Sequence, residues 1–413
     1  MSQRSFLFLQ GPRTPFYKQL AAALRKSGQL ATQLQFTVGD SANWQGASIK
    51  YQGSIDGLNA YYEQLFGRRS FTDLIVFGDC RPVHAKAIPI AQKNGVRVHV
   101  FEEGYIRPHW ITLEINGANA HSHLPSDPNW FRTTGTLIPN EPFESLPGSF
   151  SQRAVYDVAY NLCNLGNYIW FPYYERHALH SPISEYYAYV KRGLRVLQRR
   201  KYDHRVIEEL VASRVPYFLL PLQMDGDYQV RQHSPFGDMT AVLKHVMHSF
   251  ALHAPKDALL VVKNHPLDPG FADYQQLIAQ ESRWQGLSDG KKSRVVYLET
   301  GHLPTLLAQA AGCVTVNSTV GAQALTHDCP LIALGKAFYD MPGLSHQGGL
   351  DGFWQNPDPI DHALYEQFRK TVLHTTQING GFYTREGIRL AVKNALPRLL
   401  ATQSPLETLG VPC

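Results

Sequence analysis

Residues 261–268, which read Val-Val-Lys-Asn-His-Pro-Leu-Asp, decide the fold class of this chain. The apolar run at 259–262 predicts a strand that is buried on both faces, as in a parallel sheet covered by helices. Ligands of such sheets bind just beyond the carboxyl ends of the strands, where Lys263 and His265 stand. Pro266 restricts the backbone at His265, so the imidazole is presented at a defined angle. The pattern favours a phosphate contact; the alternative is a strand-end turn whose histidine only caps a neighbouring carbonyl.

A second polar strand end follows further along the chain. Residues 313–316 predict another buried strand, and Asn317-Ser318-Thr319 opens into a helix. Serine and threonine are favoured at helix N-caps, where free N–H groups and the positive end of the helix dipole form an anion site. Gly321 allows a backbone or a ligand to approach closely. These residues predict a phosphate site, with an ordinary capped helix as the alternative.

Length and composition limit the class of protein. The 413 residues suit two α/β domains rather than one. Lys plus Arg number 39 against 34 Asp plus Glu, and without a long basic run this mild excess gives little support to nucleic-acid binding. The five cysteines are scattered and form no Cys-x-x-Cys pair, so neither a disulfide framework nor a zinc site is predicted. We find no signal segment and no run of membrane-spanning length, which predicts a cytoplasmic protein.

Strand-like and helical runs alternate in the first half of the chain. Strands are expected at residues 6–10, 73–78 and 96–101, and helices at 15–27 and 82–94. This βαβ periodicity predicts a parallel sheet with helices on both faces. The pattern degrades between residues 105 and 201, where we expect a long insertion or loop region followed by helices.

A second alternating series begins near Tyr217, after an expected helix at 203–214. The strands are expected at 217–222, 259–262, 295–298, 313–316 and 331–334, and the helices at 239–253, 271–280, 304–310, 321–326, 361–374 and 385–400. We therefore expect an α/β fold in the GT-B arrangement, with two Rossmann-like domains and a cleft between them. The expected bounds are 1–202 for the N-terminal domain with its insertion, 203–375 for the C-terminal domain, and 376–413 for a C-terminal helix that crosses back to the first domain.

Polar clusters follow the expected strands of both domains. The first domain offers Asp79, Arg81, Glu102 and Arg107, and the second offers Gln223, Asp225, Asp227, Lys263, His265, Asn317, Ser318 and Thr319. A cleft lined by them suits transfer from a nucleotide-sugar, because cations or N–H donors can hold the leaving phosphate while a carboxylate acts at the anomeric carbon. In the first domain, ion pairs that only shape the loops, Glu102 with Arg107 and Asp79 with Arg81, are the alternative.

Two aspartates share the Asp-x-Asp spacing of a metal motif. They are Asp225 and Asp227, and they stand in the second domain beside an expected strand end. We therefore prefer Asp227 as a catalytic carboxylate over a metal ligand.

One helical stretch and one aromatic segment have unusual compositions. Basic residues at 191–192, 195 and 199–201 alternate with apolar ones, which indicates a solvated helix face or, as the sharper reading, contact with an anionic membrane. Residues 156–174 are rich in aromatic side chains. We expect them to be buried in inter-domain packing, with a bilayer interface as the alternative.

The motifs taken together resemble a known family. Their segments are residues 7–12, 77–81, 102–108, 221–223, 227–230, 263–266, 317–321 and 379–383. In order and spacing the chain resembles the bacterial capsule polysaccharide biosynthesis proteins of the KpsS type, over nearly its whole length. The resemblance implies a GT-B fold and a retaining β-Kdo glycosyltransferase that takes Kdo from CMP-β-Kdo and starts the β-Kdo linker on phosphatidylglycerol.

The resemblance also assigns roles to residues. It implies that Asp227 is the nucleophile and that His265, Ser318 and Thr319 form the CMP-phosphate site. Asp225 stays an alternative nucleophile, which would occupy the reactive position if the strand end had a different register. The remaining candidates are Lys263, Asn317, Gly321 and Gln223 for the nucleotide-sugar, and Asp79, Arg81, Glu102 and Arg107 for substrate or acceptor.

The chemistry of CMP-Kdo suits this residue set. Its leaving group is a single phosphate, so one His, one Lys and a helix N-terminus supply sufficient charge, and neither a metal nor a cofactor is expected. The Kdo carboxylate suits a bidentate arginine, for which Arg107 and Arg231 are candidates. Expected partners are the inner-membrane surface, a poly-Kdo-extending transferase and the capsule export machinery, but no nucleic acid. The alternatives are a GT-B enzyme that uses another nucleotide-sugar, and a non-enzymatic export or scaffold protein.

Overall fold

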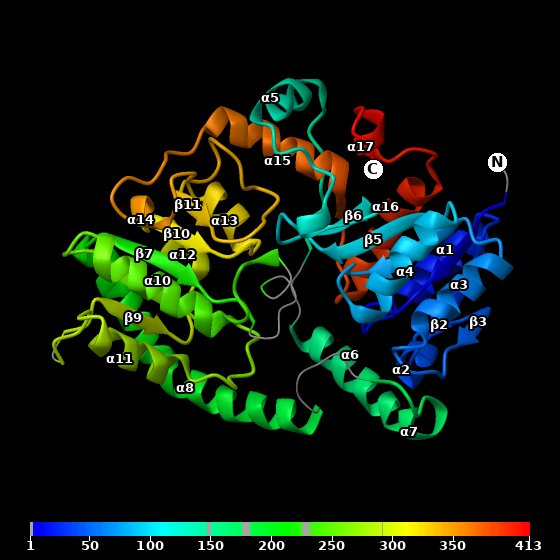
Figure 1. Cartoon of the computed structure of the whole chain (residues 1–413), viewed down its shortest axis with the longest axis horizontal. Coiled ribbons are helices and arrows are strands. Elements are labelled where there is room, and N and C mark those ends of the chain that lie inside the picture. The colour runs from blue at the N-terminus through cyan, green and yellow to red at the C-terminus, as the bar shows by residue number, and fades with distance from the viewer. Residues whose placement is uncertain (1–2, 147–149, 176–181, 225–229, 231–232, 291) are drawn as a thin grey trace. The chain divides into compact units, whose positions relative to one another are not determined.

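The computed structural model describes residues 3–146, 150–175, 182–224, 230, 233–290 and 292–413. The chain folds into two compact units. Unit 1 contains Met1–Pro125, Thr136–His177 and Arg369–Cys413, and unit 2 contains Ser126–Gly135 and Ala178–Phe368. Each unit is built around one sheet of its own (Figure 1). The mixed α/β class expected from the sequence is confirmed, and the cleft expected between the two units stays a prediction.

The sheet of unit 1 has seven strands in the order β12-β6-β5-β4-β1-β2-β3. The strands are β1 Ser5–Phe8, β2 Leu30–Gln35, β3 Ser48–Lys50, β4 Asp73–Phe77, β5 Arg97–Glu103, β6 Trp110–Ile115 and β12 Gln377–Asn379. Strands β1 to β5 run parallel in the 3-2-1-4-5 order of a Rossmann fold. Strand β6 runs antiparallel to β5 and to β12, so the expectation of a purely parallel sheet is wrong at this edge. Residues 104–109, which connect β5 to β6, are too few for the crossover helix that a parallel pair needs.

Helices cover both faces of this sheet. They are α1 Phe16–Lys26, α2 Val38–Ala42, α3 Leu58–Arg68, α4 Pro82–Lys93, η1 Asn119–His121, α6 Phe150–Cys163, η2 Asn164–Gly166, α7 Asn167–Trp170, α16 Arg385–Leu400 and α17 Pro405–Thr408. Phe8 and Phe77 point to the face covered by α1 and α16, while Leu7 and Val98 point to the face covered by α3 and α4. Because alternate strand residues are buried on opposite faces, both layers have apolar cores. Figure 1 shows α16, in red, beside α1, in blue, so the end of the chain completes the first unit.

The sheet of unit 2 has five parallel strands in the order β11-β10-β7-β8-β9. They are β7 Tyr217–Pro221, β8 Leu259–Lys263, β9 Val295–Leu298, β10 Gly312–Thr315 and β11 Leu331–Ala333. With β7 counted as the first strand, the order is again 3-2-1-4-5, so unit 2 is also Rossmann-like. Each of these strands agrees with the sequence-based expectation to within one residue at either end.

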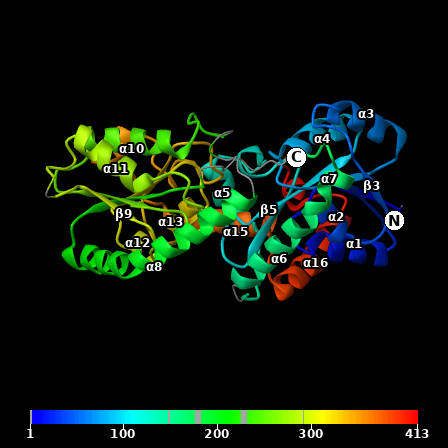
Figure 2. The same ribbon diagram turned by 90° about the horizontal axis from the view of Figure 1, so that it is seen from below.

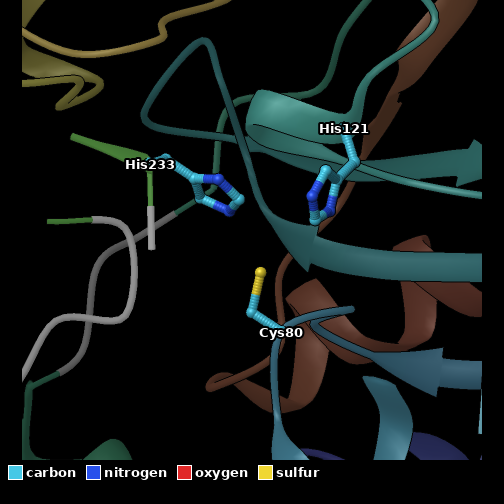
Figure 3. A group of neighbouring side chains, drawn as sticks. All are labelled: Cys80, His121 and His233. Atoms are coloured by element: carbon cyan, nitrogen blue, oxygen red, sulfur yellow. The ribbon is translucent and has the colours of Figure 1, made fainter. Parts of the chain in front are cut away.

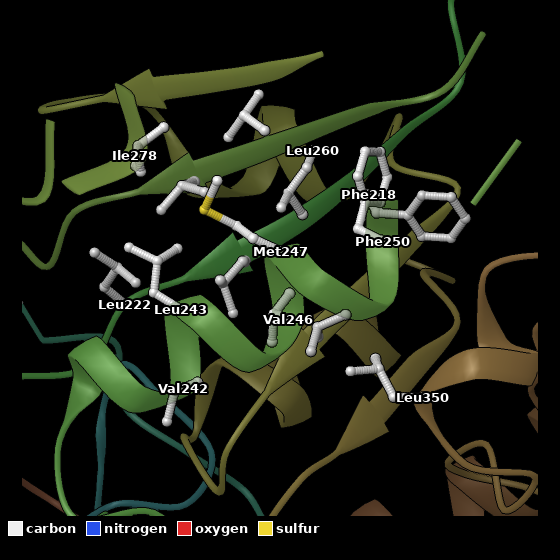
Figure 4. Packing of buried hydrophobic residues seen from close by; sticks show 14 of the residues in the cluster. Phe218, Leu222, Val242, Leu243, Val246, Met247, Phe250, Leu260, Ile278 and Leu350 are labelled. Atoms are coloured by element: carbon white, nitrogen blue, oxygen red, sulfur yellow. The ribbon is translucent and has the colours of Figure 1, made fainter. Parts of the chain in front are cut away.

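A core of apolar side chains holds the helices of unit 2 on this sheet. The helices are α8 Pro182–Ser213, α10 Met239–His253, α11 Tyr274–Trp284, α12 Leu303–Leu307, α13 Val320–Thr326 and α14 Leu350–Phe353, while α5 Pro128–Leu137 and α15 His362–Thr376 pass between the two units in sequence. Met247 and Phe250 of α10 pack with Phe218 and Leu260 of the sheet (Figure 4). Helix α11 begins three residues later than expected because the Asp273 side chain accepts a hydrogen bond from the backbone N–H of Gln276 and caps it there.

The segment between residues 105 and 201 differs most from the expectation. It contains strand β6 as well as helices, and the boundary expected between residues 202 and 203 falls inside the continuous helix α8, which belongs to unit 2. The aromatic segment 156–174 is not buried as expected: Tyr160 and Phe171 are, but the Tyr168 side chain is 87% exposed and Trp170 and Tyr173 are also exposed. The aromatic composition of this segment does not say which of its side chains meet the rest of unit 1.

Candidate functional site

In both units the candidate residues stand at the carboxyl ends of parallel strands. The strand order reverses between β1 and β4 in unit 1 and between β7 and β10 in unit 2. Ligands of open α/β sheets bind in the crevice beside such a switch point. Residues 9–12 and 78–81 stand there in unit 1, and residues 222–223 and 316–319 stand there in unit 2.

The tip of β8 has a buried polar core. Lys263 and Asn264 are both buried, and the Lys263 ammonium donates to the carbonyl oxygen of Asn264 at 3.3 Å. Burial lowers the pKa of Lys263, and the Arg192 charge lowers it further, while the Glu299 charge opposes both. The Asn264 amide donates to Asp268 at 3.3 Å and to Glu299 at 3.2 Å. These bonds fix the backbone from which His265 projects.

His265 has a defined tautomer. Its Nδ1 accepts a hydrogen bond from the backbone N–H of Leu267 at 3.1 Å, so the neutral ring carries its proton on Nε2. The backbone N–H of His265 in turn donates to the Asn264 side chain at 2.8 Å. Because Nδ1 is an acceptor, the neutral ring offers Nε2–H as a hydrogen-bond donor, which is the group that a phosphate oxygen requires.

Arg192 of α8 holds the same loop from outside the sheet. Its guanidinium donates to the carbonyl oxygens of His265 at 2.8 Å and Pro266 at 2.9 Å, and also to that of Asp268. Its Nε donates to Glu299 at 2.8 Å. Arg192 is only 6% exposed, so its assignment to a solvated or membrane-facing basic surface is wrong. Along α8, Arg192 shares a helix face with Ala188 and Asp203, which are also buried.

Glu299 is the charge partner of this arginine. Burial alone would raise the pKa of Glu299, but hydrogen bonds from Arg192 and from Tyr297, together with the arginine charge, hold it below its usual value. The pair is therefore ionised at neutral pH. An ionised, buried pair of this kind orders a loop because removal of either partner leaves an uncompensated charge.

Gln223 and Asn317 form a reciprocal pair at the switch point. The Gln223 amide donates to the Asn317 side-chain oxygen at 3.1 Å, and the backbone N–H of Asn317 donates to the Gln223 side-chain oxygen at 3.3 Å. Strand β7 lies between β10 and β8, so Gln223 stands between Asn317 and Lys263. The structure thus brings these three predicted residues to one edge of the sheet.

The Ser318-Thr319 turn is bonded largely within itself. The backbone N–H of Ser318 donates to Thr315 at 3.2 Å, that of Val320 donates to the Ser318 hydroxyl at 3.2 Å, and that of Gly321 donates to the Ser318 carbonyl at 3.0 Å. Thr319 does not cap α13 through its side chain, and that helix has only seven residues. The expected helix-start anion site is therefore weaker than predicted, and a phosphate here would rely more on hydroxyl groups.

Gly321 has a packing role. A Cβ atom added to it would lie 2.2 Å from the ring of the buried residue Tyr339. The Tyr339 hydroxyl donates to the Ser318 carbonyl at 2.7 Å. The space beside Gly321, which was expected to admit a ligand, is thus filled by the Tyr339 ring that supports the turn.

In unit 1, Asp79 lies at the centre of a hydrogen-bond network. It is buried, accepts from the backbone N–H of Ala118 at 3.1 Å, and lies 3.0 Å from Nδ1 of His121. Cys80 donates to it at 3.2 Å. Figure 3 draws Cys80 and His121 of this network together with His233, which belongs to unit 2. No sequence pattern singles out His121, which lies in η1, far along the chain from Asp79.

Arg81 does not take the role of an ion-pair partner for Asp79. Its guanidinium lies 4.8 Å from the centre of the Phe77 ring and reaches the Gly11 carbonyl at 3.4 Å. Gly11 follows β1 and Arg81 follows β4, so this contact joins the two strand ends at the switch point. Arg107 is exposed, and its Nε donates to the Gly104 carbonyl of its own loop at 3.1 Å, so the Glu102–Arg107 ion pair offered as an alternative is not among the described contacts.

The carboxyl group of Glu102 in unit 1 has a shifted pKa. Burial raises the pKa of Glu102 to about 7, the Glu103 backbone and the Arg81 charge oppose the rise, and the Glu103 and Asp79 charges add to it. The backbone N–H of Glu103 donates to it at 3.0 Å. A carboxyl group that titrates near neutral pH can both take up and release a proton during a reaction.

Three predicted residues lie outside the described part of the chain. They are Asp225, Asp227 and Arg231, which follow β7 in the sequence. Of the described residues nearby, Gln223 follows β7 and pairs with Asn317, and Val230 lies in the core of unit 2.

Comparison with known proteins gives the family. A family model described as capsule polysaccharide biosynthesis protein matches residues 72–383. The chain belongs to this family. It is 36% identical over 388 residues to the capsule polysaccharide export protein KpsS of Escherichia coli, covering 93% of this chain and 98% of that protein. The resemblance inferred from the motifs is confirmed.

Two further proteins are similar to this chain. The capsule polysaccharide modification protein LipB of Neisseria meningitidis serogroup A is 34% identical over 394 residues, which is 93% of each protein. Among solved structures, the β-Kdo 2,7 transferase KpsC of Thermosulfurimonas dismutans is similar over 95% of this chain and 99% of that one, with 13% sequence identity and a TM-score of 0.46. In the described part of the present chain, no helix is long and apolar enough to cross a membrane.

Proposed function

We propose that this capsule-family protein is a retaining β-Kdo transferase that moves Kdo from CMP-β-Kdo to phosphatidylglycerol, at the start of the poly-Kdo linker. The observation that carries the proposal is the tip of β8, where a buried lysine and a histidine of fixed tautomer stand beside the Gln223–Asn317 pair. One phosphate needs few cationic or hydrogen-bond-donating groups, and Lys263 and His265 are the groups proposed to hold it. The family membership and the motif order support the choice of CMP-Kdo.

In the proposed mechanism the sugar is bound covalently to the enzyme between two displacement steps. The Asp227 carboxylate attacks the anomeric carbon, the bond to CMP breaks, and the phosphate leaves with the electron pair while Lys263 and His265 stabilise its charge. A hydroxyl of the lipid then attacks the glycosyl-enzyme and releases Asp227. The hydroxyl proton is released to water as the new bond forms. Two displacements retain the anomeric configuration.

A panel of nucleotides tests the choice of leaving group. Thermal unfolding is measured with CMP, CDP, UDP and GDP at equal concentrations, because a ligand that binds only the folded protein raises the unfolding temperature. We expect CMP to stabilise the protein most. Stabilisation by UDP instead would favour a glycosyltransferase with another sugar donor, and no response to any nucleotide would favour the export or scaffold alternative.

Paired substitutions test the nucleophile. We expect Asp227→Asn to abolish transfer, by several orders of magnitude, while CMP binding and the unfolding temperature stay close to the parent values. Asp225→Asn is the matched control, two residues away with the same change of charge. Loss of transfer in Asp225→Asn with retention in Asp227→Asn would move the nucleophile to Asp225, and activity in both variants would refute a carboxylate nucleophile in this segment.

A further inference from the structure

The outer side of α8 carries an apolar stripe that meets solvent. Tyr187, Val190, Leu194 and Leu197 follow one another at spacings of three and four residues, so they share one face of the helix. All four are exposed, and Leu197 is 70% exposed. The opposite side carries Arg192, which holds the His265 loop. The exposed face of α8 is therefore the more apolar one, the reverse of an ordinary surface helix.

Basic residues continue and border this stripe. The same spacing leads from Leu197 to Lys201 and Arg205, and Lys191 stands beside Val190. Every exposed charged side chain between residues 187 and 205 is basic, because the one acidic residue in that span, Asp203, is buried. A stripe of apolar side chains with basic flanks is complementary to an anionic lipid surface: the apolar groups enter the interface and the cations meet the headgroups.

A second stripe of the same kind lies on unit 1. Val155, Val158, Leu162, Leu165 and Ile169 are exposed along one side of α6, η2 and α7. In Figures 1 and 2 these helices run along the outside of their unit. The one charged residue between 155 and 173 is Asp157, whose half-exposed carboxylate pairs with Arg13.

The inner side of this second segment is polar. The Tyr160 hydroxyl lies 2.9 Å from that of Thr37, and the side-chain oxygens of Asn164 and Asn167 accept from the backbone N–H groups of Gly39 and Val38, each at 2.8 Å. Hydrogen bonds therefore hold the segment on its unit and leave its apolar side outward. An apolar side of this length in water is costly unless another surface covers it.

Aromatic residues lie at the end of the second stripe. Tyr168, Trp170 and Tyr173 are exposed, and the Lys50 ammonium lies 4.9 Å from the centre of the Trp170 ring. Tryptophan and tyrosine are enriched at the level of lipid headgroups, where one end of the ring is apolar and the other is hydrated, and lysine commonly accompanies them there. The composition of this end fits the headgroup region of a bilayer.

We propose that the exposed stripes of α8 and of α6–α7 bind the surface of an anionic lipid bilayer. The proposal rests on the proposed function in one respect, since a lipid acceptor requires the enzyme to reach a membrane. A bilayer fits α8 better than a second copy of this chain does, because pairing two copies of this stripe would bring Lys191, Lys201 and Arg205 against one another. Because α8 also holds the His265 loop through Arg192, the bound lipid surface and the sugar-donor loop would share one helix.

Vesicle binding tests the proposal without any sugar donor. The intact protein is sedimented with vesicles of phosphatidylcholine alone and with vesicles that also contain phosphatidylglycerol. We expect at least tenfold stronger partitioning onto the anionic vesicles, reduced by added salt. Leu194→Ser with Leu197→Ser, Leu165→Ser with Ile169→Ser, and Lys191→Glu with Lys201→Glu should each weaken that partitioning about tenfold.

The controls use one exposed apolar residue and one exposed lysine elsewhere on unit 2. Trp284 is 90% exposed at the end of α11, and Lys256 is exposed in the loop before β8. Trp284→Ser and Lys256→Glu should bind the anionic vesicles as the parent does. Equal loss of binding in these controls would show non-specific adsorption and overturn the proposal.

Two further measurements separate the outcomes. Hydrogen exchange on the parent protein should slow in α8 and α6 on addition of phosphatidylglycerol vesicles, which needs no variant to fold. Transfer to a soluble short-chain phosphatidylglycerol should be unchanged in Leu194→Ser with Leu197→Ser, so loss of membrane binding is distinguished from failure of the proposed transfer. The proposal is overturned if all three stripe variants bind vesicles as the parent does. It is also overturned if the parent is a dimer that binds no vesicles and dissociates when Leu194→Ser and Leu197→Ser are introduced.

Discussion

Arg192 donates a hydrogen bond from its guanidinium to the carbonyl oxygen of His265 at 2.8 Å, although the two residues stand 73 positions apart in the chain. Through this bond and those to Pro266 and Asp268, helix α8 fixes the loop at the tip of β8. His265, which is proposed to contact phosphate, is therefore positioned by Arg192, a residue of a helix and not of a strand end.

Breaking this arrangement should destabilise unit 2. Arg192→Met leaves Glu299 buried without its charge partner, and loss of one partner of a buried pair costs roughly 3–5 kcal/mol. Arg192→Met with Glu299→Gln should recover part of that loss, because no buried charge remains. Urea unfolding measures both variants. A loss below about 1 kcal/mol in Arg192→Met would contradict the positioning role.

His265 should contribute directly to nucleotide binding. A charge-assisted hydrogen bond to phosphate is worth roughly 1.5–3 kcal/mol, so His265→Ala should weaken CMP binding by about tenfold to a hundredfold in calorimetry. His362→Ala is the control, since His362 is exposed at the start of α15 and away from the strand ends. If His265→Ala binds CMP as tightly as the parent, the histidine is only a strand-end turn residue.

Two glycines of unit 2 should respond in opposite directions to the same change. Gly321→Ala forces a Cβ atom into the Tyr339 ring, and overpacking of this kind costs roughly 1–3 kcal/mol. Gly193 lies within α8, and no atom stands within 4 Å of an added Cβ, so Gly193→Ala should stabilise the protein by about 1 kcal/mol. Thermal unfolding compares the two. Normal stability of Gly321→Ala with lost CMP binding would restore the ligand role first predicted for this glycine.

Glu114 should make stability depend on pH in a stated direction. Burial raises the pKa of Glu114 to about 7, and hydrogen bonds from Ser122 and Tyr105 oppose the rise. The folded protein therefore binds this proton more tightly than the unfolded chain, so its contribution is complete below the unfolded pKa, near 4.5, and is lost as pH rises through 7. The contribution amounts to ~3 kcal/mol.

The comparison with Glu114→Gln isolates this effect from other titrating groups. Glutamine keeps the size of the side chain and an oxygen that can accept from Tyr105, but it does not titrate. The stability of the parent relative to the variant should fall between pH 5 and pH 8, as measured by urea unfolding at fixed ionic strength. A constant difference across that range would show that Glu114 does not titrate as described.

The strands of unit 2 could be predicted because each is a short apolar run buried on both faces. This signal is local, and it also located Gln223, Lys263 and Asn317 at one edge of the sheet. Strand β6 could not be predicted because it lies in a segment of mixed composition. It pairs antiparallel with β5 and β12, which are far from each other in the sequence.

The roles of single residues depended on tertiary neighbours and could not be predicted. Arg192 stands in a basic run whose other members are mostly on the surface, and its contacts with Glu299 and with the His265 loop distinguish it. Gly321 shows the same limit, because the ring that fills the space beside it belongs to Tyr339. The exposure of α6 is a third case, since polar contacts with residues 37–39 hold the helix by its less apolar side.

The most direct test of the proposed function is the transfer reaction itself. The intact protein is incubated with CMP-β-Kdo and a phosphatidylglycerol analogue, and the lipid product is analysed by mass spectrometry and for its anomeric configuration. We predict β-linked Kdo on the lipid, formed by the parent and lost by several orders of magnitude in Asp227→Asn. Absence of a Kdo-lipid product from a parent protein that binds CMP, or undiminished transfer by Asp227→Asn, would contradict the account.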